Sequence, residues 1–128
     1  MKKLKDINIL IIDDMQTSFE VLSSIIKKFF PEINIDYLSS GENIIDFLSN
    51  NKVKYNLIFI DVMMPDKDGI IILNEIKTYN KKIPLIAHTS INAPETLLDI
   101  GFSDFYLKGS SINDLLAIFK LHLKISPK

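Results

Sequence analysis

The sequence has no cysteine and no arginine, and it has few glycines and prolines. Without cysteine, the chain cannot form disulfides, a thiolate zinc site or a cysteine nucleophile. Without arginine, it lacks the two-pronged guanidinium contacts that bind phosphate or guanine. Only 4 glycines and 5 prolines accompany 47% hydrophobic residues, which excludes fibrous repeats and wholesale disorder. A length of 128 residues suits one compact domain.

Net charge and long apolar runs are also lacking. Fifteen basic and 16 acidic residues leave a net charge of −1, which offers no general attraction to nucleic acid or to an anionic membrane. No apolar stretch approaches the roughly 20 residues that span a bilayer, and the basic start of the chain precedes too short an apolar run for a signal peptide. We therefore expect a cytoplasmic protein without nucleic-acid or membrane partners.

Short runs of isoleucine, leucine and phenylalanine alternate with segments of helical period, which is typical of βα units around a parallel sheet. The strands are expected at 7–13, 33–38, 56–61, 83–89 and 103–108. The first, third and fourth are almost unbroken apolar runs and should be covered on both faces, whereas the second alternates and should lie at an edge. The pattern predicts a doubly wound α/β fold, with five parallel strands and helices on both faces.

Five helices are expected between and after these strands. The first carries an apolar stripe and should end at Pro31, and the others are expected at about 41–51, 70–79, 94–100 and 111–124. Gly101 should stop the fourth helix, and the hydroxyl of Ser110 or Ser111 should cap the fifth. The stripe of the first helix comprises Met15, Phe19, Leu22, Ile26 and Phe29.

Charged and hydroxyl side chains follow four of the predicted strands. Asp13 and Asp14 end the first strand, Asp61 the third, Thr89 the fourth and Lys108 the fifth. Parallel strands present their carboxyl ends at one side of the sheet, so these distant residues should meet there. Two carboxylates about 5 Å apart repel by roughly 3 kcal/mol at an effective dielectric constant near 20, so three of them need a cation. Ligands that are all oxygen favour Mg²⁺.

Carboxylates around a metal ion, beside a lysine and a hydroxyl, can stabilise a phosphoryl group during transfer, and a carboxylate can be its acceptor. Each residue also has an ordinary structural explanation. Asp13 and Asp14 could cap the first helix, Asp68 and Gly69 are common in turns, and Lys108 could be a surface charge. The convergence of the whole set on one side of the sheet favours the functional interpretation.

These residues resemble a response-regulator receiver domain of the stand-alone kind. The resemblance rests on the acidic pair, on Asp-Val-Met-Met-Pro-Asp-Lys-Asp-Gly at 61–69, on Thr89-Ser90 and on Lys108, and it spans nearly the whole chain. It implies a flavodoxin-like strand order 2-1-3-4-5. Because the predicted elements fill the chain, we also expect a single domain over residues 1–128 without an output domain. The resemblance further implies a two-component or phosphorelay signalling protein that is not an enzyme beyond its own phosphorylation and dephosphorylation.

The resemblance implies a phosphoryl site with Mg²⁺ as cofactor. Asp61 would accept the phosphoryl group from a histidine kinase or a histidine phosphotransfer protein. Asp14 would bind the metal directly, Asp13 would bind it through water, and the backbone carbonyl of Met63 would complete the protein ligands. Lys108 would pair with a phosphoryl oxygen.

The resemblance also implies a conformational switch, and it bears on the lifetime of the phosphorylated form. Thr89 would hydrogen-bond the phosphoryl group while Phe105 rotates inward. Met63 and Ile91 occupy the positions that flank hydrolytic water in this family, and because both are apolar we expect a long-lived phosphorylated form. Gly109 stands where proline is usual, which predicts a looser lysine and slower phosphorylation than in a Gly109→Pro variant.

The last helix has apolar residues on two sides. One set should face the sheet, and it comprises Ile112, Leu115, Leu116, Phe119 and Leu123. Ile118, Leu121 and Ile125 should form an opposite stripe that docks a downstream protein or a second copy. Scattered exposed apolar residues are the competing explanation. His88 and His122 lack metal-ligand spacing and are interpreted as a strand-end and a surface residue.

Other classes of protein remain as alternatives. A flavodoxin-like electron carrier would need a phosphate-binding loop rich in Ser, Thr and Gly after the first strand, where this chain has Asp14-Met-Gln-Thr. A phosphatase with an aspartyl intermediate would need a second Asp at Met63. A receiver-like interaction domain that works without phosphorylation, or a receiver module cut from a hybrid histidine kinase, is the alternative within the family.

Overall fold

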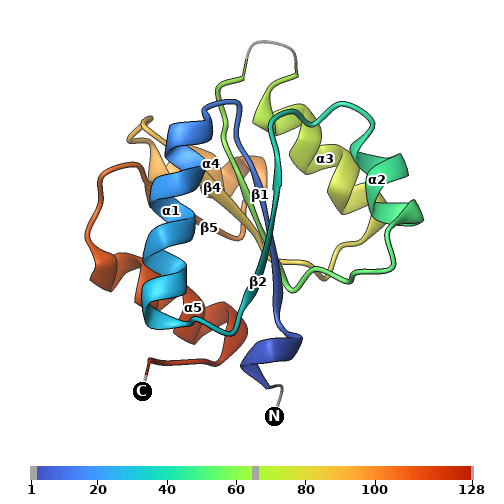
Figure 1. Cartoon of the computed structure of the whole chain (residues 1–128). Coiled ribbons are helices and arrows are strands. Elements are labelled where there is room, and N and C mark those ends of the chain that lie inside the picture. The colour runs from blue at the N-terminus through green and yellow to red at the C-terminus, as the bar shows by residue number, and fades with distance from the viewer. Residues whose placement is uncertain (1–2, 65–66, 128) are drawn as a thin grey trace.

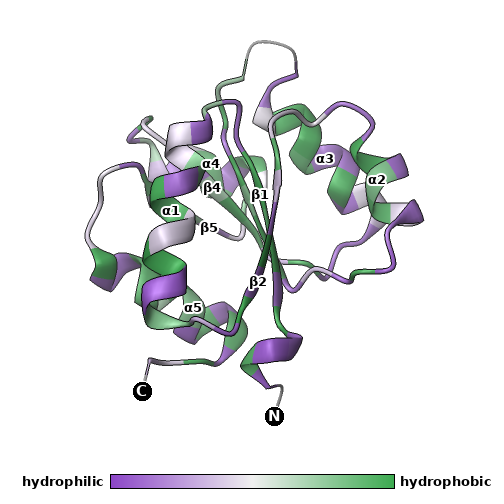
Figure 2. Cartoon of the chain, viewed as in Figure 1, coloured by the Kyte–Doolittle hydropathy of each residue, from purple (hydrophilic) through white to green (hydrophobic). Residues whose placement is uncertain are grey.

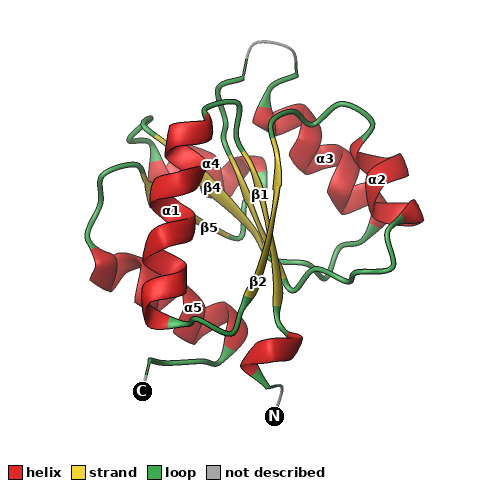
Figure 3. Ribbon diagram, in the orientation of Figure 1, coloured by secondary structure: helices red, strands yellow, loops and turns green. Residues whose placement is uncertain are grey.

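Five parallel strands form the centre of the molecule, and helices cover both faces (Figures 1 and 3). The structure is a computed structural model that describes residues 3–64 and 67–127. The sheet order is β2-β1-β3-β4-β5, which confirms the predicted doubly wound fold and its strand order. The strands are β1 (Asn8–Ile12), β2 (Asn34–Leu38), β3 (Leu57–Ile60), β4 (Leu85–Thr89) and β5 (Asp104–Leu107).

The helices divide between the two faces of the sheet. A short 3₁₀ turn, η1 (Leu4–Asp6), precedes β1. The five α-helices are α1 (Gln16–Phe29), α2 (Ile44–Asn50), α3 (Gly69–Tyr79), α4 (Pro94–Ile100) and α5 (Ile112–Leu123). α1 and α5 pack on one face, and α2, α3 and α4 pack on the other (Figure 1). None of the helices in the described parts of the chain is long and apolar enough to cross a bilayer.

Burial along the strands follows their apolar content. β3 and β4 are buried at every position, and β1 is buried at all but its first residue. β2 alternates between exposed and partly buried residues, as its mixed sequence predicts for an edge strand, and β5 forms the other edge. In Figure 2, hydrophobic residues predominate along the central strands, and hydrophilic residues alternate with hydrophobic ones along the helices. Each fully buried isoleucine or leucine side chain contributes about 1.5–3 kcal/mol to stability.

The helix ends agree in part with the predicted signals. α1 ends at Phe29, before Pro31, and Gly101 ends α4 with a φ of +129°. The Ser111 hydroxyl caps α5 by accepting the backbone N–H of Asp114 at 3.3 Å. The interpretation of Asp68 as a simple turn residue is wrong, because its carboxylate caps α3.

The apolar stripe of α1 differs from the prediction at both ends. Met15 lies before the helix and is 54% exposed, so its assignment to the inward stripe is wrong. Phe30, just after the helix, is buried instead. The backbone leaves helical geometry there, with a φ of −137°, and the Phe30 ring packs 5.4 Å from the ring of Phe119.

The predicted second stripe of α5 is also wrong. Ile118 is only 4% exposed and packs in the core beside Phe119, whereas Ile112 is exposed. Lys124 ends the helix in the left-handed conformation, so Ile125 lies beyond it and packs partly against the same core. Of the predicted stripe, only Leu121 projects freely, at 60% exposure.

Candidate functional site

Three carboxylates gather at the carboxyl end of the sheet. Asp13 and Asp14 follow β1, and Asp61 follows β3. One oxygen from each of the three lies within 4.8 Å of the others. Asp13 is fully buried and Asp61 is 4% exposed, while Asp14 is open to solvent. The neighbouring strands β1 and β3 are paired in register from Ile9 and Leu57 onward, which is why residues 48 positions apart meet.

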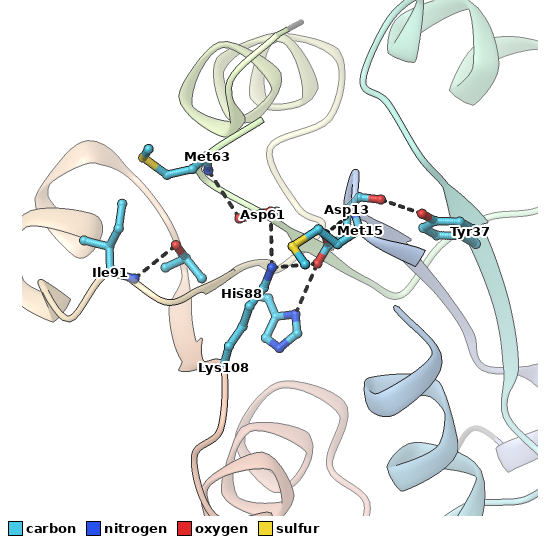
Figure 4. Close-up of polar contacts among 9 residues, drawn as sticks. Asp13, Met15, Tyr37, Asp61, Met63, His88, Ile91 and Lys108 are labelled. Carbon is cyan, nitrogen blue, oxygen red and sulfur yellow. Dashed lines mark hydrogen bonds and ion pairs between the residues drawn. The ribbon is translucent and has the colours of Figure 1, made fainter. Parts of the chain in front are cut away.

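Lys108 joins the two buried carboxylates (Figure 4). Its Nζ lies 3.2 Å from Asp13 Oδ2 and 3.3 Å from Asp61 Oδ2. Burial favours the neutral amine, but the charges of Asp61 and Asp13 outweigh this and raise the pKa of Lys108 above its ordinary value. The lysine therefore remains a cation that offsets part of the negative charge of the site.

Gly109 follows Lys108 with a φ of +86°, which proline cannot adopt because its ring fixes φ near −65°. A Gly109→Pro variant would therefore need a different loop conformation. A change in its phosphorylation rate would reflect that new conformation as well as the reduced flexibility of the loop. Lys108 already contacts two carboxylates. The expectation that the glycine loosens this lysine finds no support in this geometry.

The backbone of α3 approaches the backbone of Asp61 closely at Gly69. The N–H of Met63 donates to Asp61 Oδ1 at 3.2 Å, and the N–H of Gly69 donates to the carbonyl of Val62 at 2.9 Å. A Cβ on Gly69 would lie 2.3 Å from the carbonyl oxygen of Asp61, so only glycine fits. Burial raises the pKa of Asp61 to about 6, although the charge of Lys108 opposes the shift.

Pro65 and Asp66 of the predicted motif lie outside the described residues. Asp68, near its end, begins α3. Its Oδ1 accepts the backbone N–H groups of Ile70 and Ile71 at 3.0 and 3.1 Å. The aspartate and Gly69 therefore attach α3 directly beneath the Asp61 loop.

Asp13 is held by its own loop and by the edge strand. Its Oδ1 accepts the N–H of Met15 at 2.9 Å, so it does not cap α1, and that structural explanation is wrong. The Tyr37 hydroxyl donates to the carbonyl of Asp13 at 2.7 Å, and its ring stacks on Phe19 with 4.2 Å between centroids. The sequence indicated Tyr37 only as part of an alternating edge strand.

The remaining predicted residues surround this cluster. Thr89 is buried at the end of β4, and its Oγ1 accepts the N–H of Ile91 at 3.2 Å. Phe105 is partly buried against the core formed with α2, α3 and α4. Met63 is exposed, and with Ile91 it lines a groove of about 610 Å³ beside the Asp61 loop.

Both histidines differ from the sequence interpretation. His88 is not merely a strand-end residue, because it is 5% exposed and its Nδ1 lies 3.9 Å from Asp13 Oδ2. Burial lowers the pKa of His88 to about 4, and the charge of Lys108 adds to the shift, so the ring is neutral at pH 7. His122 is partly buried, and its Nε2 lies 3.0 Å from Asp104 Oδ2.

The donor set fits a hard divalent cation. It consists of three carboxylates, and the net charge of the cluster remains negative even with Lys108 present. Asp13 Oδ2 is buried, and Lys108 is its ion-pair partner in the described parts of the chain. An oxygen-only site of this kind suits Mg²⁺, which keeps several waters and binds one or two carboxylates.

Comparisons with known proteins agree with this arrangement. Residues 9–120 match the family model of the response regulator receiver domain. The transcription factor SKN7 of Candida albicans is 28% identical over 124 residues, covering 94% of this chain and 21% of that protein. The response regulator RppA of Synechocystis is 26% identical over 97 residues, covering 73% of this chain and 42% of RppA. The chain thus spans less than half the length of these two relatives.

A solved structure shares the whole architecture. A two-component response regulator from Clostridium difficile superposes with a TM-score of 0.78 and is 27% identical, covering 92% of this chain and 96% of that one. The likeness therefore extends over most of both chains.

Proposed function

We propose that this chain, which belongs to the response-regulator receiver family, accepts a phosphoryl group on Asp61 and transmits a signal through protein contacts. The observation that carries the proposal is the arrangement around Asp61. Its buried carboxylate lies beside the Lys108 ammonium and two further carboxylates, at the carboxyl end of the sheet where α/β folds bind their ligands. This chain has neither the phosphate-binding loop that an electron carrier would need nor the second aspartate that a phosphatase would need.

The proposed step is phosphoryl transfer from a phosphohistidine. An Asp61 carboxylate oxygen forms the new P–O bond while the P–N bond of the donor breaks, and the departing imidazole keeps the electron pair. With a pKa of about 6, Asp61 is mostly ionised at pH 7 and can act as the nucleophile. Lys108 can follow the phosphoryl oxygens, because its Nζ already lies 3.3 Å from Asp61 Oδ2.

Asp14, Asp13, Asp61 and the backbone carbonyl of Met63 would hold Mg²⁺. When bound, the metal ion supplies positive charge that stabilises the equatorial phosphoryl oxygens. Asp13 and Asp14 serve different purposes because one is buried and the other is exposed. The exposed Asp14 would bind the metal ion directly, and the buried Asp13 would bind it through water.

Thr89 and Phe105 would form the switch. Thr89 Oγ1 now accepts the N–H of Ile91, and turning toward a phosphoryl oxygen would break that contact and move the loop after β4. Phe105 is partly buried, so it has room to become fully buried. Met63 and Ile91 present no polar group to a hydrolytic water, which supports the expectation of a long-lived phosphorylated form.

The phosphodonor would be a histidine kinase or a histidine phosphotransfer protein, and the receiver would act in the cytoplasm. Output would pass to a downstream protein or a second copy. Leu121 is the best supported contact residue for this step, because it is exposed and lines a groove of about 320 Å³ with Phe105. Ile118 contributes only the floor of that groove, since it belongs to the core.

Intact-mass measurement after incubation with acetyl phosphate and Mg²⁺ tests the proposal. The wild-type protein should gain one phosphoryl group, and Asp61→Asn should gain none. Asp46→Asn is the matched control, because Asp46 is an exposed aspartate on α2, remote in the sequence from the cluster. A wild-type mass that does not change would contradict the proposal and would favour an interaction domain that works without phosphorylation.

A further inference from the structure

Two buried polar atoms face each other beside the acidic cluster without a hydrogen bond. In the described parts of the chain, Asp13 Oδ2 and His88 Nδ1 are both inaccessible to solvent and lack hydrogen-bond partners. They lie 3.9 Å apart and point toward one another (Figure 4). The Lys108 ammonium forms an ion pair with the same Asp13 oxygen at 3.2 Å. A buried polar atom without a partner costs about 1–3 kcal/mol, so such a pair calls for an explanation.

The surroundings of His88 decide which ring nitrogen carries its proton. A neutral imidazole has one N–H group and one lone pair. If Nδ1 carried the lone pair, this acceptor would face the Asp13 carboxylate, which is also an acceptor, and the two could not form a hydrogen bond. An N–H on Nδ1 instead faces an acceptor, and we assign the proton there.

The other side of the ring can satisfy the remaining lone pair. In Figure 4 the second ring nitrogen points away from Asp13. His88 lines a groove of about 330 Å³ between α1 and the β5–α5 connection, and the hydroxyl-bearing residues Ser18 and Ser110 also line it. Water or a hydroxyl can therefore donate to Nε2, which completes the hydrogen bonding of this tautomer.

Aromatic packing fixes the ring in this orientation. The Tyr106 ring stacks on His88 with 5.5 Å between centroids and 11° between planes. Phe59 meets the ring edge-on at 6.1 Å. Since β4 also places the residue between β3 and β5, the imidazole cannot turn away from Asp13 without disturbing the core.

We propose that His88 is a positioning residue for Asp13. The Nδ1–H of His88 holds the Asp13 carboxylate in the orientation that a divalent cation requires. This inference rests on the proposed function. Lys108 now neutralises Asp13, but in that function it turns toward a phosphoryl oxygen. The Met15 N–H still donates to Asp13 Oδ1, and His88 is then the neighbouring donor for Oδ2, as second-layer partners are for metal ligands.

A purely structural role is the competing explanation, because an aromatic ring in this layer also fills space between Phe59 and Tyr106. Three substitutions separate the two roles. His88→Phe keeps the stacking and removes the donor. His88→Asn places a side-chain N–H near the position of Nδ1 and loses the stacking. His88→Leu is branched at Cγ as asparagine is, but it has no donor.

Mg²⁺ affinity measured by titration calorimetry is the first readout. His88→Phe and His88→Leu should bind Mg²⁺ about 10- to 100-fold more weakly than wild type, while His88→Asn should recover most of the affinity despite its poorer packing. Wild-type affinity in His88→Phe would overturn the inference. A wild-type protein that binds no Mg²⁺ at all would instead contradict the proposed function, so the two failures are distinguishable.

Nitrogen NMR of the histidine rings in the intact wild-type protein is the second readout, and it does not depend on how the variants fold. The chain has only two histidines, and a His122→Gln sample identifies the signals of His88. The expected spectrum shows the proton on Nδ1. A spectrum with the proton on Nε2 would overturn the inference, because Nδ1 could not then donate to Asp13.

Discussion

At the amino end of the sheet, the polar side chains form hydrogen bonds and are either uncharged or exposed. At the carboxyl end, several charged groups lie close together. At the amino end, the backbone N–H of Asn8 donates to Asn56 Oδ1 at 2.8 Å, and the Asn34 amide donates to the carbonyl of Lys5 at 2.9 Å. At the carboxyl end, oxygens of three carboxylates lie within 4.8 Å of one another, and two buried atoms have no hydrogen bond to any described residue.

The two ends lie in one small domain and share the same strands, so the contrast is local. At the amino end, backbone and side-chain partners satisfy the hydrogen bonds of the polar groups, so this end needs no ligand. The carboxyl end retains negative charge, because one lysine faces three carboxylates. This charge favours binding of a cation and lowers stability when no cation is bound. Substitutions at each end should therefore affect different properties.

Gly69→Ala should have the largest effect on stability. The added Cβ would lie 2.3 Å from the Asp61 carbonyl oxygen and 2.8 Å from Val62 Cα, and both are backbone atoms that cannot move aside cheaply. We expect a loss of about 3 kcal/mol in the free energy of unfolding, together with slower phosphorylation, measured by urea denaturation and intact mass. Gly109→Ala is the control, since its Cβ would meet nothing within 4 Å and its φ of +86° should cost about 1–2 kcal/mol. Equal losses in the two variants would contradict the role of Gly69.

Two groups at the carboxyl end should give opposing pH dependences in metal-free buffer. Burial raises the Asp61 pKa from 3.8 to about 6, so its contribution to stability is present below pH 4 and is lost as the pH rises through 6. Burial lowers the His88 pKa from 6.5 to about 4, so its contribution is present above pH 6.5 and is lost as the pH falls through 4. The two slopes largely cancel in the wild-type protein.

Variants should separate these slopes. Between pH 4 and 6, the stability of His88→Phe should fall with rising pH, and the stability of Asp61→Asn should rise. Each change should amount to about 3 kcal/mol across the window, since one pKa unit corresponds to about 1.4 kcal/mol. Chemical denaturation at a series of pH values is the measurement, and parallel profiles for the two variants would refute the assignment.

Mg²⁺ should stabilise the protein only through the carboxyl end. At a concentration 100 times its dissociation constant, a ligand that binds only the folded state raises the free energy of unfolding by about 2.7 kcal/mol. Asp14→Asn should lose most of this gain, whereas Asp6→Asn, an exposed aspartate near the amino end, should keep it. Thermal unfolding with and without Mg²⁺ measures the gain, and an undiminished gain in Asp14→Asn would exclude Asp14 as a ligand.

The same chemical change at each end should give the smallest but most direct comparison. Tyr55 donates its hydroxyl to Asp36 Oδ2 at 2.6 Å near the amino end, and Tyr37 donates to the carbonyl of Asp13 at 2.7 Å. Tyr55→Phe and Tyr37→Phe should each lower stability by about 1 kcal/mol. Only Tyr37→Phe should also slow phosphorylation by acetyl phosphate. A similar slowing in Tyr55→Phe would show that the two ends are not independent.

Much of the fold could be predicted from local patterns. The unbroken apolar runs of β1, β3 and β4 indicated strands covered on both faces, and Pro31, Gly101 and Ser111 indicated helix ends, because backbone geometry and capping depend on near neighbours. The gathering of acids at one end of the sheet was also predictable, since parallel strands present their carboxyl ends together.

The orientation of α5 was not predictable in the same way. Its apolar residues occur on two sides, and the sequence alone favoured the wrong one for Ile118. Which side becomes buried depends on how the helix rotates against β5 and α1. That rotation is set by the packing of the whole core, including the Phe30 ring against Phe119.

The sequence by itself determined the order of strands and helices along the chain, the strand ends that carry acids and Lys108, and the charge deficit that calls for a cation. Only the tertiary structure decided that His88 and Tyr37 reach Asp13, that Gly69 lies against Asp61, and which side of α5 is buried. The reason is physical: local sequence sets backbone conformation and polarity, whereas contacts between distant residues depend on how complete layers pack.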